Sequence, residues 1–477
     1  MRDFVQHIHF VGIGGIGMSG IAEVLLDLDF QVSGSDLSDT AILERLRQAG
    51  ATIYIGHDGM NIKGADAVVV SSAIDDNNSE AVAARDNRIP LVPRAEMLGE
   101  LMRFRKGIAI AGTHGKTTAT SLVATVLASA GLDPTFIVGG VVNSVNSNVC
   151  LGRGEYLVAE ADESDASFLH LQPQIAVVTN IDHDHMQTYD GDFNRLKQAY
   201  LDFLHNLPFY GLAILCFDDP NIREIATAIR RPIVSYGTSE GVDYRATNIV
   251  HNGRESAFEV IRFGQSIGQF NLALPGRHNV LNALAAISIA YKLGLSAQSI
   301  GTALSGFQGI GRRFQPLGEV RIGSHRVEVI DDYAHHPTEL AATLQASKDC
   351  WPERRILVVF QPHRFSRTRD LFDDFVQLLA GVDHLIITEV YPAGEQAISG
   401  SDGRSLCRAI RKRGNDPVFV ETLEELNAVL PNMVQSGDLL LTLGAGDIGR
   451  FAQSLADRSP PPIPITKEAA NDAANEK

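Results

Sequence analysis

A stretch at residues 107–118, GIAIAGTHGKTT, carries residue types that bind phosphate. An apolar run ends at a glycine, and Gly115, Lys116 and Thr117 then lead into a pattern typical of a helix at 118–130. Glycines let backbone N–H groups approach a phosphate chain, the helix N-terminus adds partial positive charge, and the lysine adds a full charge. The hydroxyl of Thr117 is where a phosphate-bound magnesium ion takes a protein ligand. The stretch predicts a nucleoside triphosphate site. An ordinary glycine turn is the alternative, because the gap between the glycines is shorter than in the usual loop.

Acids and histidines follow two apolar strands further along the chain. The strand predicted at 156–159 runs into EADESD, and the strand predicted at 175–179 runs into NIDHDH. The carboxyl ends of parallel strands meet at one edge of a sheet, so these groups predict a metal–phosphate site there. Lys and Arg are scarce in both groups, and a bound cation would neutralise them. Magnesium prefers oxygen ligands, so Thr117 and a carboxylate fit more readily than a histidine. Solvated loop charge that caps helices is the alternative.

A third set of polar residues opens the helix predicted to run to Leu293, in the string LPGRHNVLNA. His278, Asn279 and Asn282 crowd its first turn. A helix cap needs only one such residue, and planar His and Asn side chains can also contact a purine. Capping and ligand binding both remain open from the sequence.

The N-terminal stretch IHFVGIGGIGMSGIAEVLLDLDFQVSGSD predicts a strand, a glycine turn, a helix and a second strand that ends at Asp36. The glycines fit G-x-G-x-x-G, and the acid follows at the spacing seen in dinucleotide-binding folds. A third strand, predicted at 67–70, ends next to Ser71. The motif predicts a diphosphate near a helix end but does not say which nucleotide carries it. A tight turn without a ligand is the alternative.

The last part of the chain again alternates strands and helices. Its strands are predicted at 327–330, 356–360, 385–388 and 439–443, and three of them end in DDYAHHP, QPHRFSRTR and GAGDIG. Arg364 and Arg367 are three residues apart, so on a helical turn they would share a face. Paired arginines suit a carboxylate or a phosphate, and a solvated basic turn is the alternative.

These motifs require several α/β units to position them, and the composition agrees. A chain of 477 residues has room for roughly three domains. The net charge of −16 argues against a nucleic-acid surface. The 4 cysteines are isolated, which predicts a reduced protein with buried thiols. The first residues do not resemble a signal peptide, no apolar run is long enough for a membrane span, and residues 459–477 are predicted to be disordered.

Taken together, seven strings resemble the Mur ligase family: HFVGIGGIGMSGIA, GTHGKTT, EADESDASF, TNIDHDH, GRHNVLNA, DDYAHHPTE and QPHRFSRT. The resemblance covers the chain except its tail, and the short phosphate loop is the family's own form. It implies an α/β enzyme with an N-terminal Rossmann-like domain at 1–106, a central P-loop ATPase-like domain with a mostly parallel sheet at 107–311, and a C-terminal Rossmann-like domain at 312–458. These would bind UDP-N-acetylmuramate, ATP and the amino acid, respectively.

The resemblance also implies the reaction. The muramate carboxylate would be joined to L-alanine through an acyl phosphate, giving ADP and phosphate, in peptidoglycan precursor synthesis in the cytoplasm. Mg²⁺ would be the cofactor, and the protein would be a monomer or a homodimer that binds neither nucleic acid nor membrane.

Site residues follow from the matched motifs. The implied uridine-nucleotide residues are Gly14, Gly15, Gly17, Asp36, His57, Ser71 and Arg94. The implied ATP residues are Gly112, Thr113, Gly115, Lys116, Thr117, Thr118, His278, Asn279 and Asp332. The implied metal ligands are Thr117, Glu160 and His185, and the implied catalytic residues are Lys116, Glu160, His185, Arg364 and Arg367. Tyr333 and His335 would line the amino-acid side. His114 receives no role, and no carbamylated lysine is assigned.

Four other functions would each explain part of the sequence. A nicotinamide-dependent oxidoreductase would explain the first glycine motif but not GTHGKTT or the acidic groups. A recycling ligase that adds a preformed tripeptide to UDP-N-acetylmuramate is related, but GIGGIGMSG and the third-domain strings favour the alanine-adding activity. A folate polyglutamylating ligase should lack the uridine-nucleotide motif. A non-catalytic nucleotide-binding regulator would not need the full set of Lys116, Thr117, Glu160 and His185.

Overall fold

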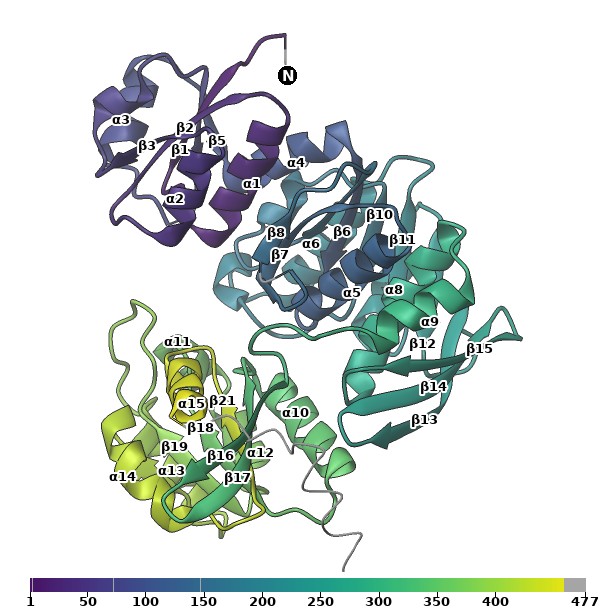
Figure 1. Ribbon diagram of the computed structural model, residues 1–477, viewed down its shortest axis with the longest axis vertical. Helices are drawn as coiled ribbons and strands as arrows, with labels where there is room; N and C mark the ends of the chain where they lie inside the picture. The colour runs from purple at the N-terminus through teal and green to yellow at the C-terminus, as the bar shows by residue number, and fades with distance from the viewer. Residues whose placement is uncertain (2, 72, 146, 459–477) are drawn as a thin grey trace, which may run out of the picture. The chain divides into compact units, whose positions relative to one another are not determined.

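The computed structural model describes residues 1, 3–71, 73–145 and 147–458 (Figure 1). The chain forms two compact units, one of residues 1–311 and a second that begins at Arg312. Strands and helices alternate through both units, which confirms the predicted α/β class. The tail predicted to be disordered, 459–477, lies outside the described residues.

The first sheet has five parallel strands in the order β3-β2-β1-β4-β5. Its strands are β1 (His7–Val11), β2 (Gln31–Asp36), β3 (Thr52–Ile55), β4 (Ala67–Val70) and β5 (Leu91–Pro93). The helices between them are α1 (Ile16–Asp27), α2 (Ala41–Gln48), η1 (Gly59–Ile62), α3 (Ser79–Asp86) and α4 (Arg94–Phe104). The chain reverses direction across the sheet between β1 and β4. In doubly wound sheets the loops diverge at such a point and open a crevice for ligands.

The second sheet has ten strands in the order β15-β14-β13-β12-β11-β10-β6-β9-β7-β8. Its strands are β6 (Lys106–Ala111), β7 (Thr135–Val142), β8 (Ser147–Cys150), β9 (Tyr156–Glu160), β10 (Ile175–Val178), β11 (Leu212–Cys216), β12 (Ile233–Gly237), β13 (Tyr244–Asn252), β14 (Glu255–Arg262) and β15 (Gln265–Leu272). The strands from β7 to β13 are parallel, and β8, β14 and β15 pair antiparallel with their neighbours. Strand β6 therefore lies between β10 and β9, the two strands that end in acids and histidines.

Helices cover this second sheet. They are α5 (Lys116–Ser129), η2 (Ser167–His170), η3 (Met186–Tyr189), α6 (Phe193–His205), α7 (Pro220–Ala226), α8 (Arg277–Lys292) and α9 (Ala297–Ser305). Helices α5 and α8 pack against each other, and most residues of both are buried. A helix buried on nearly all sides is typical of a central layer. The N-terminus of α5, where the phosphate motif lies, is therefore fixed by packing along the helix.

Helix α1 packs on β7 and β8 and joins the first sheet to the second. A Cβ at Gly20 would lie 2.5 Å from Cγ2 of Val149, so this approach requires a glycine. One continuous apolar core accordingly runs from Ile8 to Ile310. The predicted domain boundary between residues 106 and 107 stays a prediction, as do the other domain limits.

The sheet of the second unit has six strands in the order β16-β17-β21-β18-β19-β20. Its strands are β16 (Gln315–Ile322), β17 (His325–Asp332), β18 (Ile356–Phe360), β19 (His384–Thr388), β20 (Val418–Val420) and β21 (Leu439–Leu443). Its helices are α10 (Pro337–Cys350), α11 (Phe365–Asp370), α12 (Phe372–Leu379), α13 (Gly403–Arg411), α14 (Leu423–Met433) and α15 (Ile448–Asp457). Only β16 pairs antiparallel within this described sheet. Two apolar clusters pack around it.

Three predicted strands have the predicted bounds: β4, β18 and β21. The helix predicted at 118–130 is α5, but it begins at Lys116. Gly115 takes a φ of 83° at the N-cap, which turns the chain directly into the helix. The phosphate loop is thus tighter than the sequence pattern indicated.

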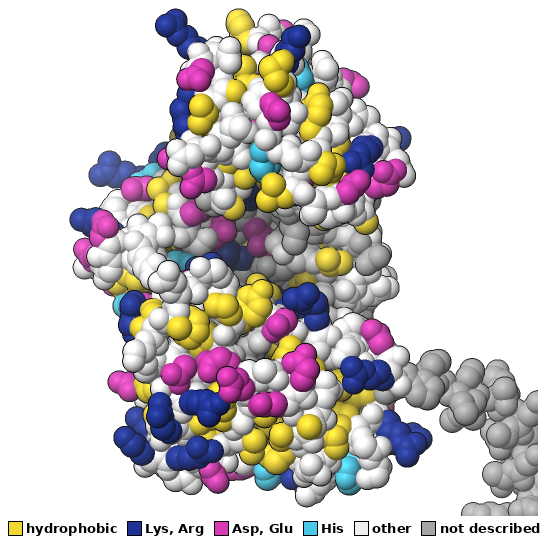
Figure 2. Space-filling view, turned by 90° about the vertical axis from the view of Figure 1, so that its left-hand side faces the viewer, with side chains coloured by type: hydrophobic (Ala, Val, Ile, Leu, Met, Phe, Trp, Pro, Cys, Tyr) yellow, Lys and Arg dark blue, Asp and Glu magenta, His cyan; other side chains and the backbone are white. Residues whose placement is uncertain are grey.

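The four cysteines are free thiols, as predicted, although Cys150 is only half-buried. Among the described residues, no helix combines the length and the apolar content needed to cross a membrane. Acidic side chains lie among basic ones on the face drawn in Figure 2.

Candidate active site

The first glycine turn lies between β1 and α1. Helix α1 has Gly15 at its N-cap, with no side-chain hydrogen bond to its first N–H groups. The N–H of Gly14 donates to Oδ2 of Asp36 at 2.9 Å. A Cβ at Gly17 would lie 2.9 Å from Nη1 of Arg94. The turn therefore brings together five of the predicted uridine-nucleotide residues and offers N–H groups and a guanidinium to an anion.

His57 belongs to a buried polar network at the same edge. Its Nδ1 lies 2.9 Å from Oγ of Ser35 and 3.1 Å from Oε2 of Glu80. Asn61 donates to the other oxygen of Glu80 at 2.7 Å. Burial alone would raise the pKa of Glu80, but hydrogen bonds from His9, Ser35 and Asn61 hold that pKa below its ordinary value. The sequence analysis missed Glu80, because a single acid in a helix carries no motif.

Ser71 follows β4 and is half-buried, and its carbonyl oxygen accepts from the N–H of Ile74 at 3.1 Å. It thus lies at the carboxyl end of β4, directly after the strand predicted at 67–70. Its contact with a uridine nucleotide stays a prediction.

The phosphate loop connects β6 to α5. Helix α5 has no side-chain cap, so its first N–H groups have no side-chain acceptor there. Gly112 has a φ of 132°, and a Cβ there would lie 2.0 Å from Oγ1 of Thr179. The side chains of Thr113, Thr117 and Thr118 are buried around the turn. N–H groups at a helix start without a side-chain cap, behind a turn that only glycine can make, suit a phosphate chain.

Lys116 points back into this loop. Its Nζ donates to the carbonyl oxygens of Gly112 at 2.8 Å and Thr113 at 3.3 Å. It also contacts both carboxylate oxygens of Glu163, at 2.9 and 2.7 Å. Burial alone would lower the pKa of Lys116, but the carboxylates of Glu163 and Asp162 raise it above its ordinary value. Burial raises the pKa of Glu163 to about 7, although Lys116 opposes this shift.

The other side of the loop is tied to the segment after β10. Asn180 accepts from the N–H of His114 at 2.8 Å and donates to its carbonyl oxygen at 2.9 Å. The N–H of Asp182 donates to Oγ1 of Thr113 at 2.9 Å. Nε2 of His114 lies 3.1 Å from Oδ2 of Asp182. His114, to which the sequence assigned no role, thus fastens the phosphate loop to the histidine-containing segment.

Two predicted metal ligands lie along β7. The N–H of Gly139 donates to Oε1 of Glu160 at 2.8 Å. A Cβ at the next residue, Gly140, would lie 3.1 Å from Cγ2 of Thr117. Adjacent glycines therefore leave room beside both side chains. A hydroxyl and a carboxylate are ligands that Mg²⁺ prefers.

The third predicted ligand, His185, lies in the turn before η3 with a φ of 55°. Its Nε2 is 3.5 Å from Oδ2 of Asp184. The same turn is tied to the acidic segment, because the hydroxyl of Tyr189 donates to the carbonyl oxygen of Glu163 at 2.5 Å. The two acidic groups are thus joined at one sheet edge, as the sequence predicted.

Helix α8 begins after Gly276 with the predicted purine residues. Asn279 is buried, and its Nδ2 donates to the carbonyl oxygen of Pro275 at 2.7 Å. A Cβ at Gly115 would lie 2.7 Å from Oδ1 of Asn282, so α8 reaches the phosphate loop. His278 is half-buried at the helix start. The contact with adenine predicted for His278 and Asn279 stays a prediction, and Asn279 also has a structural task.

In the second unit, the predicted residues gather at the carboxyl edge of the sheet. Asp332 is buried, and its carboxylate accepts from the N–H groups of Phe314 and Ala334, both at 2.8 Å. Burial raises the pKa of Asp332 to about 6. The guanidinium groups of Arg312 and Arg313 each lie 5.0 Å from the ring of Tyr333. Asp332 therefore fixes the start of the second unit, and its contact with the ATP ribose stays a prediction.

The prediction that Arg364 and Arg367 share one face of a helical turn is wrong. Helix α11 begins at Phe365, and Arg364 precedes it with a φ of 69°. This left-handed residue turns the chain, so Arg364 is exposed while Arg367 is buried. The two arginines cannot act as a pair through helical spacing alone.

His363 is a site residue that the sequence analysis missed. Its ring stacks on Tyr391 with centroids 5.5 Å apart and meets His335 edge-on at 5.8 Å. Nη1 of Arg367 lies 3.5 Å from its Nδ1. Burial and the charges of Arg367 and Arg364 lower the pKa of His363 to about 4. A neutral histidine among aromatic rings and arginines lines this edge, and its place directly before the arginines was the available signal.

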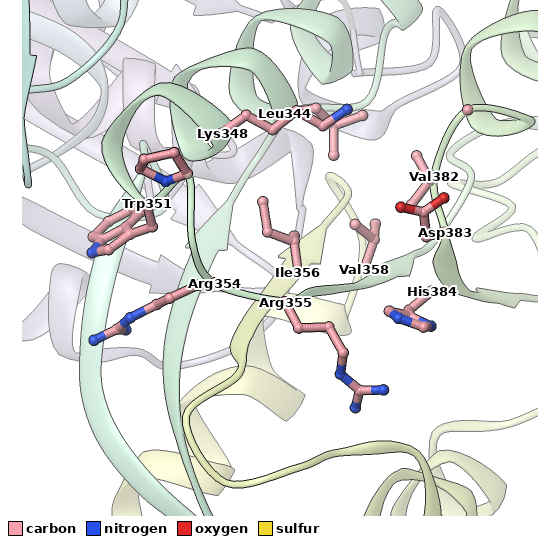
Figure 3. Close-up of a pocket in the computed structure, with 12 residues that line it drawn as sticks. Leu344, Lys348, Trp351, Arg354, Arg355, Ile356, Val358, Val382, Asp383 and His384 are labelled. Carbon is pink, nitrogen blue, oxygen red and sulfur yellow. The ribbon is translucent and has the colours of Figure 1, made fainter.

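A cavity of about 370 Å³ in the second unit lies elsewhere, beside the amino ends of β18 and β19 (Figure 3). It is lined by Leu344, Lys348, Trp351, Pro352, Arg354, Arg355, Ile356, Val358, Gly381, Val382, Asp383 and His384. No predicted site residue lines it, and Arg355 in its wall is bound to Asp438 at 2.7 and 2.9 Å. The predicted residues lie at the opposite, carboxyl edge, where parallel α/β sheets bind ligands, so the cavity is not assigned to the site.

Three family models match successive parts of the chain. The model described as "Mur ligase family, catalytic domain" matches residues 7–106, "Mur ligase middle domain" matches 110–290, and "Mur ligase, glutamate ligase domain" matches 312–446.

Individual relatives are similar along nearly the whole chain. A UDP-N-acetylmuramate–L-alanine ligase from Methylococcus capsulatus is 58% identical over 455 residues, which is 95% of this chain and 96% of the relative. The crystal structure of a UDP-N-acetylmuramate–alanine ligase from Thermotoga maritima has a TM-score of 0.77 at 32% identity, covering 95% of this chain and 98% of that one. A murein peptide ligase from Psychrobacter arcticus has a TM-score of 0.66 at 26% identity, with the same coverage of 95% and 98%.

Proposed function

We propose, from the premise that this chain belongs to the Mur ligase family, that it is an ATP-dependent ligase joining UDP-N-acetylmuramate to L-alanine. The carrying observation is the 58% identity over 95% of the chain with an enzyme of that name. The products are the amide, ADP and phosphate, and the reaction belongs to peptidoglycan precursor synthesis. We place it in the cytoplasm, in a protein that is a monomer or a homodimer.

The chemistry requires activation of a carboxylate. A carboxylate is anionic and its leaving group would be oxide, so it is a poor acyl donor. Transfer of the γ-phosphoryl group of ATP makes an acyl phosphate, whose leaving group is phosphate. The neutral amine of L-alanine then attacks the acyl carbon, and the tetrahedral intermediate collapses. No protein nucleophile is needed, and the effect of the protein is to orient three substrates and to stabilise charge.

We assign the residue roles from the matched motifs, and the geometry of the site supports them. Lys116 and the N–H groups at the start of α5 bind the ATP phosphates, with Gly112, Thr113, Gly115 and Thr118 shaping the loop. The turn of Gly14, Gly15 and Gly17, with Asp36, His57, Ser71 and Arg94, binds the UDP-sugar. Tyr333, His335, Arg364 and Arg367, with His363 added, line the amino-acid side.

Thr117, Glu160 and His185 would hold Mg²⁺. The donor set fits, because the hydroxyl and the carboxylate lie beside adjacent glycines and the loops around them are rich in acids. When bound, the ion would neutralise phosphate charge during transfer. The carboxylates of Asp162 and Glu163 would repel the phosphates of ATP bound without a cation. The need for a cation to neutralise this negative charge supports the proposal.

One assay separates this function from the recycling ligase. The protein is incubated with ATP, Mg²⁺ and UDP-N-acetylmuramate, and phosphate release is measured after addition of L-alanine, other single amino acids or the preformed tripeptide. Release that depends on L-alanine is expected. Release without alanine, or only with the tripeptide, would overturn the proposal. Lys106→Ala, at an exposed lysine of the central sheet, is the control for Lys116→Ala, which should abolish release.

A further inference from the structure

The ammonium group of Lys116 occupies the phosphate loop itself. It has three N–H bonds, and four acceptors surround it at 2.7–3.3 Å: the carbonyl oxygens of Gly112 and Thr113 and both oxygens of Glu163. The donor capacity of the lysine is therefore filled. A phosphate oxygen can accept a hydrogen bond from Lys116 only by replacing one of these four acceptors.

Glu163 cannot follow the lysine out of the loop. Its side chain is 1% exposed. Its carbonyl oxygen accepts from the hydroxyl of Tyr189 at 2.5 Å and from the N–H of Ala166 at 3.0 Å, so the backbone is held on two sides. The carboxylate is thus a fixed partner, and the flexible lysine stem is the part that moves.

We propose that Glu163 is the positioning residue of Lys116: it holds the ammonium group at the phosphate loop before a nucleotide binds and gives it up to the phosphate oxygens when a nucleotide binds. This inference rests on the proposed function, in which Lys116 binds ATP. In this role Glu163 acts through Lys116, which it contacts with both carboxylate oxygens.

The pair makes nucleotide binding weaker than the loop alone would allow. Charge-assisted hydrogen bonds are among the strong ones in proteins, and separating a buried pair leaves an uncompensated carboxylate. That carboxylate also lies near the incoming phosphates, which carry the same sign. Glu163→Gln keeps the size of the side chain and removes both effects, so it should tighten nucleotide binding.

The test is calorimetric titration of ADP, at pH 8.5 where Glu163 is ionised, into the full-length wild type and into Glu163→Gln. The dissociation constant should fall about tenfold in the variant, which corresponds to one charge-assisted contact. The KM for ATP should fall by a similar factor, and kcat should change less than KM. The control is Glu155→Gln, which removes the partner of Lys106 in an exposed ion pair on the same sheet and should leave ADP binding unchanged.

If Glu163→Gln binds ADP with an unchanged or a weaker affinity, the inference is wrong. That result would mean that Glu163 still contacts Lys116 when the nucleotide is bound, so that the carboxylate supports binding. A failure of the proposed function gives a different result from a failure of this inference, because the wild type would then release no phosphate in response to L-alanine. A second measurement does not depend on nucleotide. The rate at which an acetylating ester modifies Lys116, read by peptide mass spectrometry, should rise severalfold in Glu163→Gln, and an equal rate would also overturn the inference.

Discussion

Removing Lys116 leaves Glu163 buried without its counter-ion, and the consequence for stability depends on pH. Breaking a buried ion pair by removal of one partner costs about 3–5 kcal/mol. Lys116→Met keeps the stem of the side chain and removes the charge. For a unit of residues 1–311, about 3 kcal/mol lowers the melting temperature by about 5 °C. We therefore expect a fall of this order at pH 8.5, measured by circular dichroism on the transition that contains the first unit.

The fall in melting temperature caused by Lys116→Met should be smaller at low pH. The pKa of Glu163 in the folded protein is about 7, above the ordinary value of 4.5. A carboxyl group with a raised pKa binds its proton more tightly in the folded state. Its favourable effect is therefore full below the ordinary value and is lost as pH rises through the folded value. In Lys116→Met the lysine no longer opposes the shift, so that folded pKa moves higher and most Glu163 is neutral at pH 6.

A double mutant supplies the control. Lys116→Met should cost much less in the Glu163→Gln background, where no buried charge is left unpaired. An equal fall in melting temperature in both backgrounds, or at pH 6 and pH 8.5, would refute the reasoning. The single variant Lys116→Met should lose all turnover and still bind UDP-N-acetylmuramate. Loss of that binding would contradict the proposed division of tasks between the first and second sheets.

Three further outcomes are expected. Gly112→Ala should abolish ADP binding in calorimetry, because a Cβ there would lie 2.0 Å from a threonine oxygen at a φ of 132°, whereas Gly131→Ala, at a φ of 76° in open space, should cost only about 1–2 kcal/mol of stability. Arg355→Met should lower the melting temperature of the second unit near neutral pH. Burial alone would raise the pKa of Asp438, but Arg355 holds that pKa below its ordinary value. The stability that this pair contributes is therefore present above the ordinary pKa and is lost as pH falls through the folded pKa. In acid, the difference in melting temperature between Arg355→Met and the wild type should vanish. Brief maleimide labelling of the native protein, read by mass spectrometry, should modify Cys150 alone, because the other thiols are buried with their pKa raised to about 11 or 12.

The motifs that follow strands were predictable from the sequence. Strands β4, β18 and β21 are short apolar runs bounded by polar residues, and a buried parallel strand has this pattern. The loops after β6, β9 and β10 carried the predicted acids, histidines and lysine. Their meeting at one edge followed from the rule that parallel strands bind at their carboxyl ends.

Pairings between distant residues were not predictable. Glu163 was one acid among several in EADESD, and only the turn held by Tyr189 aims it at Lys116. Glu80 lies in a helix without a motif, yet it binds residues from two other segments. The expectation that Arg364 and Arg367 share a helical face failed because Arg364 has a positive φ and precedes the helix. Helical periodicity in the sequence does not show such a backbone conformation at a non-glycine residue.

The short gap in the phosphate loop has a structural explanation in the order of the strands. Strand β6 lies between β10 and β9, so the loop that leaves β6 has a neighbouring loop on each side. On the β10 side, Asn180 binds both the N–H and the carbonyl oxygen of His114. On the β9 side, Glu163 binds Lys116. A longer loop must wrap a phosphate with its own backbone, whereas this one is held in shape by the loops beside it. We infer that two residues between Gly112 and Gly115 suffice because the neighbours supply the rigidity that loop length supplies elsewhere.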